Sequence, residues 1–139
     1  MSSGPLRPAL AGAMTLALAI AVTIGVSLPG GGSSGSLRVI HASLVGVRGT
    51  AELRLRSGYA ELVVAHMAPP PPGHIYQVWL KRDGLLPSPT TALFSVNAAG
   101  AGAVAVPGDL RRVGAVLVTS EPDGGSLSPT HAPVIIARL

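Results

Sequence analysis

The sequence predicts an all-β fold, an immunoglobulin-like β-sandwich of about seven strands preceded by one N-terminal transmembrane helix. Short runs rich in Val, Leu and Ile alternate with Pro, Gly and Asp turn signals through residues 37–139, a spacing typical of sandwiches. None of these runs has the 3.6-residue period of an amphipathic helix. Residues 9–28, in contrast, form one apolar stretch without a charged side chain, which is typical of a helix that crosses a membrane.

The apolar stretch reads ALAGAMTLALAIAVTIGVSL. As a helix it would extend roughly 30 Å, the thickness of the hydrocarbon core of a bilayer. Pro8 is tolerated at the start of a helix, and Pro29 followed by Gly30 ends one. We therefore expect a short cytoplasmic tail at residues 1–8 and a single membrane-spanning helix at residues 9–28. The protein is then a single-pass cell-membrane protein whose C-terminal domain is extracytoplasmic.

A cleaved signal peptide is the alternative interpretation of this stretch. Arg7 supplies a basic n-region, residues 10–21 a short h-region, and the alanines around Ala19 offer cleavage sites. The apolar run continues to Leu28, beyond the length that an h-region needs, which favours an uncleaved anchor. Either interpretation sends the C-terminal domain across the membrane.

Small residues recur at every fourth position of the apolar stretch and would form one stripe along a helix. Such a stripe lets two helices approach closely in lipid, so it predicts weak self-association through the helix. An alanine-rich segment also produces this spacing by chance. The stripe consists of Ala9, Ala13, Ala17, Ala21 and Gly25.

Residues 29–36 predict a flexible linker, because the segment is almost entirely Gly and Ser. The β-domain predicted after it covers residues 37–139. Residues 51–56 (AELRLR) alternate strictly between apolar and charged, which indicates a strand with one buried face. Residues 97–102 are predicted to form a hairpin loop between two strands. The other predicted strands are 37–41, 61–67, 75–81, 93–96, 103–106, 114–119 and 133–139.

Composition argues against several classes of function. The chain has no cysteine, so it cannot contain disulfides, thiolate metal sites or a cysteine nucleophile. The net charge is +4, but the basic residues are scattered along the sequence. Nucleic-acid binding needs cations aligned along phosphates and exposed aromatics for stacking. With two tyrosines, one tryptophan and one phenylalanine, we expect no nucleic-acid partner.

Histidines raise the question of a metal site. His66 and Met67 are ligands that suit copper, but adjacent residues of a strand point to opposite faces. No His-x-His or His-x-x-x-His spacing occurs. We therefore expect no metal and no cofactor. The four histidines are His41, His66, His74 and His131.

Catalysis is not indicated either. Ser126 and Ser128 lie near Asp123 and His131 in the sequence. The stretch nevertheless has no nucleophile elbow and no signature of an oxyanion hole. The six carboxylates form no recognisable acid–base pair. We expect a protein that is not an enzyme.

Two motifs resemble those of the C-terminal domain of the anti-sigma-K factor family. Residues 73–80 (GHIYQVWL) are similar to its G-x-x-Y-Q-x-W-L signature, and residues 118–130 (VTSEPDGGSLSPT) to its V-T-x-E-P-x-G-G-S-x-x-P-T ending. Residues 92–96 (ALFSV) resemble its G-x-F-x-V strand. Ala92 and His131 stand where the family commonly has glycine. The matching positions are Tyr76, Gln77, Trp79, Phe94, Thr119, Glu121, Pro122, Gly124, Gly125, Ser126, Pro129 and Thr130.

The resemblance implies a single-pass bacterial membrane protein whose outer domain senses a signal. In full-length members a cytoplasmic N-terminal region holds a sigma factor inactive until regulated proteolysis. With about eight residues before the apolar stretch, we expect this chain to lack that region. It would then regulate sigma-dependent transcription through a protein partner. The alternatives are a secreted or periplasmic ligand- or metal-binding module released by signal cleavage, and a remnant without a present role.

The motif residues admit an architectural role. Tyr76, Trp79 and Phe94 make up most of the aromatic volume, and we expect them to fill the core. Glu121 is expected to accept backbone hydrogen bonds that hold its turn. The loop after Glu121 is the candidate contact with a partner, because loops carried by a rigid scaffold commonly bind.

Overall fold

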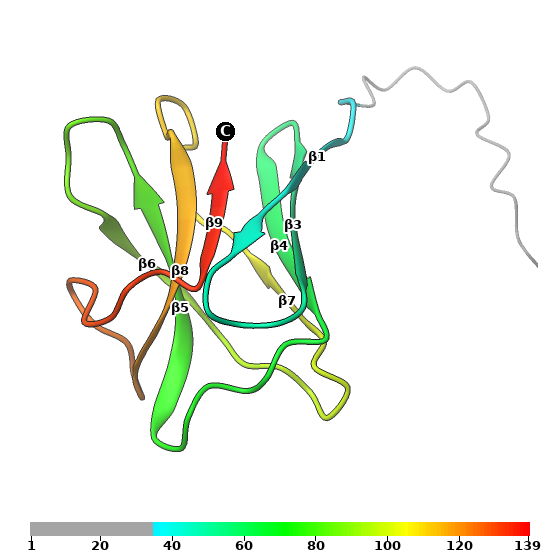
Figure 1. Cartoon of the computed structure of the whole chain (residues 1–139). Helices are drawn as coiled ribbons and strands as arrows, with labels where there is room; N and C mark the ends of the chain where they lie inside the picture. The colour runs from blue at the N-terminus through cyan, green and yellow to red at the C-terminus, as the bar shows by residue number, and fades with distance from the viewer. Residues whose placement is uncertain (1–34) are drawn as a thin grey trace, which may run out of the picture. The chain divides into compact units, whose positions relative to one another are not determined.

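The computed structural model describes residues 35–139 (Figure 1). The predicted tail, the apolar stretch with its stripe of small residues, and most of the linker lie outside the described residues. The part that is described contains no helix, and hence none that could cross a bilayer. Its nine strands are β1 (Arg38–His41), β2 (Ser43–Leu44), β3 (Thr50–Arg56), β4 (Tyr59–Ala65), β5 (His74–Lys81), β6 (Ser88–Phe94), β7 (Gly102–Ala105), β8 (Ala115–Pro122) and β9 (Ile135–Arg138).

The strands form two antiparallel sheets. One has four strands in the order β1-β3-β4-β7, and the other has five in the order β2-β9-β8-β5-β6. All paired neighbours run antiparallel. The all-β prediction is therefore confirmed for the described part of the chain.

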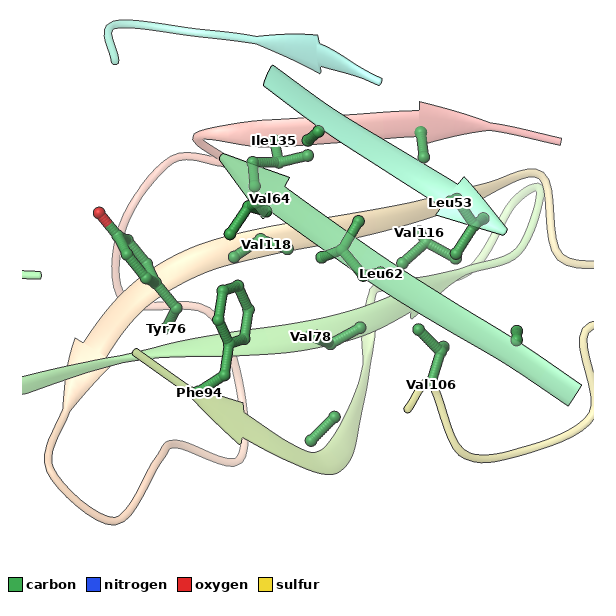
Figure 2. Packing of buried hydrophobic residues seen from close by; sticks show 14 of the residues in the cluster. Leu53, Leu62, Val64, Tyr76, Val78, Phe94, Val106, Val116, Val118 and Ile135 are labelled. Carbon is green, nitrogen blue, oxygen red and sulfur yellow. The ribbon is translucent and has the colours of Figure 1, made fainter. Parts of the chain in front are cut away.

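The core lies between the two sheets (Figure 2). In β3 Ala51 and Leu53 are buried, Leu55 is half-buried, and Arg54 and Arg56 are exposed, as the alternation in residues 51–56 predicts. Burial of these side chains from water supplies most of the stability of such a domain. The core includes Leu53, Leu62 and Val64 of the four-stranded sheet, and Val78, Val116, Val118 and Ile135 of the five-stranded sheet.

One strand differs strongly from its predicted bounds, and another was not predicted. The sequence predicts a strand at residues 93–96, whereas β6 begins at Ser88 and ends at Phe94. Pro89 is tolerated because β6 is the edge strand of its sheet, where one row of backbone amides needs no partner. The two-residue strand β2 was not predicted at all, because it is too short to show a period.

The predicted hairpin at residues 97–102 is wrong. The amide of Asn97 donates to the carbonyl of Ala101 at 2.9 Å, so the segment does turn tightly. The strands that it connects, β6 and β7, nevertheless belong to different sheets. The loop therefore crosses from one sheet to the other at one end of the domain.

The strand order also departs from that of an immunoglobulin domain. If β1 and β2 are taken as two halves of the first strand, β3 and β4 correspond to the second and third strands, which lie in different sheets of an immunoglobulin domain. Here β3 and β4 form a hairpin inside the four-stranded sheet, with Arg56 paired to Tyr59. Ser57 and Gly58 make the turn, and Gly58 adopts a φ of 72° that suits glycine. A two-residue turn leaves too little chain to reach the other sheet.

Candidate functional site

The two sequence motifs lie on paired strands at the centre of the five-stranded sheet. Gln77 of β5 is opposite Thr119 of β8, and Trp79 is opposite Leu117. Successive side chains of a strand point to opposite faces. Because Val78 belongs to the core between the sheets, the Gln77 and Trp79 side chains lie on the other face of the sheet.

The three motif aromatics are all buried, as predicted, but on two different faces of the five-stranded sheet. Tyr76 and Phe94 are in the core, with ring centroids 5.4 Å apart. Trp79 is also completely buried, at 0% exposure, but on the outer face of β5. The following loop, residues 123–134, belongs to the same motif as Thr119 and Glu121 and is bonded to that face.

A chain of hydrogen bonds links the Trp79 side chain to this loop. The indole Nε1–H of Trp79 donates to Oγ1 of Thr119 at 2.8 Å. The Thr119 hydroxyl in turn donates to Oε1 of Glu121 at 2.5 Å. Thr130 donates to Glu121 through its backbone amide, at 3.0 Å to Oε1, and through its hydroxyl, at 2.6 Å to Oε2. Glu121 thus joins the end of β8 to residue 130 of the loop.

Glu121 is a carboxylate with 0% exposure that forms no ion pair with any residue of the described part. Burial by itself raises the pKa of such a carboxyl, because it disfavours the charged form. The hydrogen bonds from Thr119 and Thr130 outweigh that effect, and the pKa of Glu121 lies below its usual value. The carboxylate is therefore charged at neutral pH and held by donors alone.

Gln77 holds the first half of the same loop. Its Nε2 donates to the carbonyl of Ser126 at 3.0 Å, and its Oε1 accepts the Ser126 amide at 2.8 Å. A buried side-chain amide with both groups paired is a rigid contact. The loop is consequently fixed at Ser126 by Gln77 and at Thr130 by Glu121.

The glycine pair allows the loop to approach Gln77. Gly124 and Gly125 have φ values of 91° and 82°, a region that L-residues rarely adopt. A Cβ on Gly125 would lie 3.0 Å from Oε1 of Gln77 and 3.1 Å from Cδ2 of Leu93, whereas a Cβ on Gly124 would meet nothing within 4 Å. The second glycine is therefore required both by conformation and by space.

We predict that Gly125→Ala destabilises the domain more than Gly124→Ala does. Both variants carry the strain of a positive φ, roughly 1–2 kcal/mol. Only Gly125→Ala also displaces Gln77, which adds about 1 kcal/mol for a disturbed buried hydrogen bond. Urea unfolding of the two variants measures the difference. Equal losses would mean that the Gln77 contact contributes nothing.

A shallow groove of about 750 Å³ lies beside the fixed loop. Its lining is mostly apolar and includes motif residues of the loop together with the edge strand β6. Leu127, at the rim, is 90% exposed. An edge strand next to an apolar groove is a surface that can bind an extended peptide. The residues that line the groove include Gln77, Thr90, Leu93, Gly125, Ser126 and Leu127.

His74 and His131 lie close together in the structure, although they are 57 residues apart in the sequence. The rings of His74 and His131 are 5.9 Å apart in an edge-to-face arrangement, and Nδ1 of His131 lies 2.9 Å from Oγ1 of Thr130. His41 lies instead beside Glu52, at 3.7 Å. The described residues contain no group of three or more His, Cys, Asp and Glu side chains able to hold a metal ion. His66 is exposed at the end of β4, and Met67 next to it is buried.

A family model described as the C-terminal domain of the anti-sigma-K factor RskA matches residues 9–134. The chain belongs to this family. The resemblance of the two motifs is thereby confirmed, and the motif residues of β5 and β8 are the ones that fix the loop beside the groove. The anti-sigma-K factor family is regulatory rather than catalytic.

One relative is a Streptomyces griseus protein described as "Uncharacterized protein in phr 5'region". It is 34% identical over 94 residues, which cover 68% of this chain and 38% of the relative. The chain therefore aligns with well under half the length of that relative. No solved structure matches. For this anti-sigma-K factor domain the site consequently has to be interpreted from its own geometry.

Proposed function

We propose that this chain is the membrane-anchored, extracytoplasmic sensor domain of a sigma-factor regulator, and that it acts by binding a protein partner. Residues 9–28 would cross the cell membrane once, and the β-domain would lie outside the cytoplasm. The partner would bind along the groove between β6 and the loop of residues 123–134. Regulation would follow from that binding and not from any chemical step in this chain.

The extent of the family match supports the anchor. The match begins at residue 9, which is the first residue of the predicted membrane segment. The apolar stretch thus lies inside the region that relates this chain to the family, which supports an anchor over an unrelated leader. Helix association through the stripe of small residues from Ala9 to Gly25 would provide a second contact with a membrane partner.

The rigidity of the loop beside the groove supports the binding site, and it is the observation that carries the proposal. Binding surfaces that are fixed in advance lose less conformational entropy when a partner binds. Gln77 and Glu121 fix the loop at Ser126 and Thr130, while Leu127 between them projects into solvent. Apolar side chains held this way are typical anchors of protein interfaces.

The test combines topology with crosslinking in cells. The chain carries a C-terminal tag and a photoreactive amino acid at Leu127, or at Ala99 in the matched control. Ala99 is exposed in the loop between β6 and β7, away from the groove. Intact spheroplasts are irradiated, and a parallel sample is treated with external protease.

We expect the full-length chain to remain with membranes, its tag to be digested from outside, and a crosslinked envelope protein to appear with Leu127 but not with Ala99. A shorter soluble product outside the cytoplasm would instead favour a secreted module released by signal cleavage. A tag that external protease cannot reach would overturn the extracytoplasmic location. The absence of a position-specific crosslink would overturn the groove as the binding site.

A further inference from the structure

Both ends of the described chain and three loops meet at one end of the β-domain (Figure 1). Gly35 lies against Ser57 in the β3–β4 turn, so the linker enters the domain here. The amide of Leu139 donates to the carbonyl of Gly114 at 3.0 Å. The amide of Gly114 donates to the carbonyl of Lys81 at 2.9 Å, which joins the β7–β8 and β5–β6 loops. We call this part the linker end.

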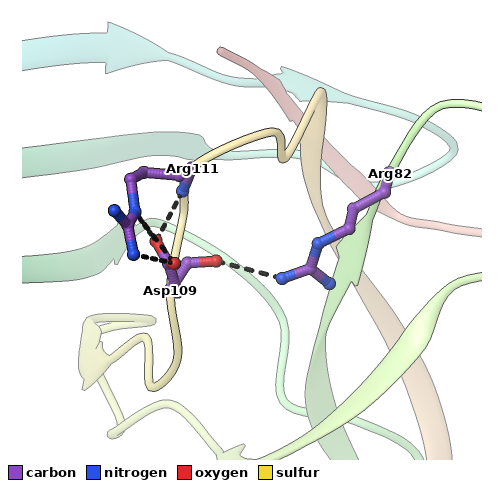
Figure 3. A network of polar contacts seen from close by, with 3 residues as sticks. All are labelled: Arg82, Asp109 and Arg111. Carbon is purple, nitrogen blue, oxygen red and sulfur yellow. Dashed lines mark hydrogen bonds and ion pairs between the residues drawn. The ribbon is translucent and has the colours of Figure 1, made fainter.

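Positive charge is concentrated at the linker end. Asp109 pairs with Arg111 at 2.8 Å, and Arg82 donates to the backbone carbonyl of Asp109 at 3.0 Å (Figure 3). Hydrogen bonds from Arg111 hold the pKa of Asp109 below its usual range, so this carboxylate stays charged and neutralises Arg111. The exposed arginines at the linker end that make no ion pair with any described residue are Arg38, Arg56, Arg112 and Arg138.

The loops of the opposite end carry almost no charge. They consist of residues 45–49, 66–73, 95–101 and 123–134, and their charged residues are Arg48 and Asp123. The positive charge of the domain is thus directed toward the end where the linker enters.

Apolar side chains project from the same end. Leu85 and Leu86 form the tip of the β5–β6 loop and are 58% and 86% exposed. The ammonium group of Lys81 donates to the backbone carbonyls of Arg82 and Leu85 and so holds the base of this loop. Two exposed leucines on a supported loop, with arginines on the neighbouring loop and strands, form the pattern of a surface that enters a lipid interface.

We propose that the linker end docks on the headgroups of an anionic membrane, with the Leu85-Leu86 tip in the interfacial layer. Anionic lipids attract cations near the surface, and the interface accepts apolar side chains. This inference rests on the proposed anchor, because a linker of residues 29–36 extends at most about 28 Å. An anchor at residues 9–28 would therefore keep the basic end of the domain within reach of the bilayer.

The absence of cysteine from the chain permits a test with one fluorophore. The full chain carries an environment-sensitive dye at Leu86→Cys, or at Ala99→Cys at the opposite end. It is reconstituted in vesicles that contain nitroxide-labelled lipid and either phosphatidylcholine alone or about one-third phosphatidylglycerol. Quenching of the dye measures docking, and flotation of the vesicles independently measures anchoring.

We expect the dye at Leu86 to be quenched in anionic vesicles, released at high salt, and unquenched in neutral vesicles, with Ala99 unquenched throughout. Arg56→Glu should lower the docking equilibrium roughly 30-fold, since it reverses one cation near the surface. Arg48→Glu, of equal net charge and at the opposite end, should leave docking unchanged. Circular dichroism establishes that both variants are folded.

Anchoring and docking can fail separately. A chain that floats in both lipids but leaves the dye at Leu86 unquenched overturns docking alone. A chain that floats only with anionic vesicles and leaves them at high salt overturns the anchor and supports docking. Flotation with neither lipid overturns both. Equal quenching of the dye at Leu86 and at Ala99 overturns the proposal that the linker end is the part of the domain that docks on the membrane.

Discussion

Trp79→Ala is expected to remove a large part of the stability of the β-domain. The indole is completely buried on the outer face of β5, and its Nε1–H is the first donor of the chain that leads through Thr119 to Glu121. Removing a buried aromatic side chain of this size costs about 3–5 kcal/mol, and small domains have only about 5–15 kcal/mol in total. Urea unfolding followed by circular dichroism measures the loss.

Trp79→Phe separates packing from hydrogen bonding. Phenylalanine fills much of the space but cannot donate to Thr119, so the cost should fall to about 1–3 kcal/mol, the range for an unsatisfied buried polar group. Thr119→Val removes the same hydrogen bond and also the one that Thr119 donates to Glu121, so it should cost more than Trp79→Phe. If Trp79→Phe were as damaging as Trp79→Ala, packing could not be the main contribution of this residue.

Local patterns predicted the strands well where only one face of the sheet is buried. Residues 51–56 alternate because one face of β3 meets the core and the other meets water. In β5 the run from Tyr76 to Leu80 is buried without a break, as in strands covered on both faces. A period of two then separates Gln77 and Trp79 from Tyr76 and Val78, but does not say which set faces the other sheet. The sequence therefore predicted that Trp79 is buried, but not on which face of the sheet it lies.

The sequence also did not reveal which distant segments pair with each other. The turn at residues 97–102 has the composition of a hairpin loop, and only the pairing of β7 with β4 shows that it crosses between sheets. The contact of His74 with His131 likewise depends on the register of β5 against β8, where His74 is opposite Pro122. The two motifs could have suggested this contact if their strands had been aligned with each other.

The sign of the pH dependence of folding follows from Glu121. Its pKa is lower in the folded domain than its usual value, so ionised Glu121 stabilises the fold. That stabilisation is fully present above the unfolded pKa of about 4.3 and is lost as pH falls through the lower folded value. We predict that Glu121→Gln costs about 1.5–3 kcal/mol at pH 7, the range for hydrogen bonds to a charged group.

The same variant should lose part of the acid sensitivity of the wild type. At pH 7 the two proteins differ by the full amount, and the difference should narrow below about pH 4, as the wild-type carboxylate becomes protonated. Trp79 is the single tryptophan of the chain, so its emission reports unfolding in both proteins.

Asp109→Asn is the matched control, because the pKa of Asp109 is also lowered, by hydrogen bonds from Arg111, but its carboxylate is exposed. A difference between wild type and Glu121→Gln that stays constant down to pH 3 would show that the charge of Glu121 does not stabilise the fold. The buried carboxylate would then act only through its shape and its hydrogen bonds to Thr119 and Thr130.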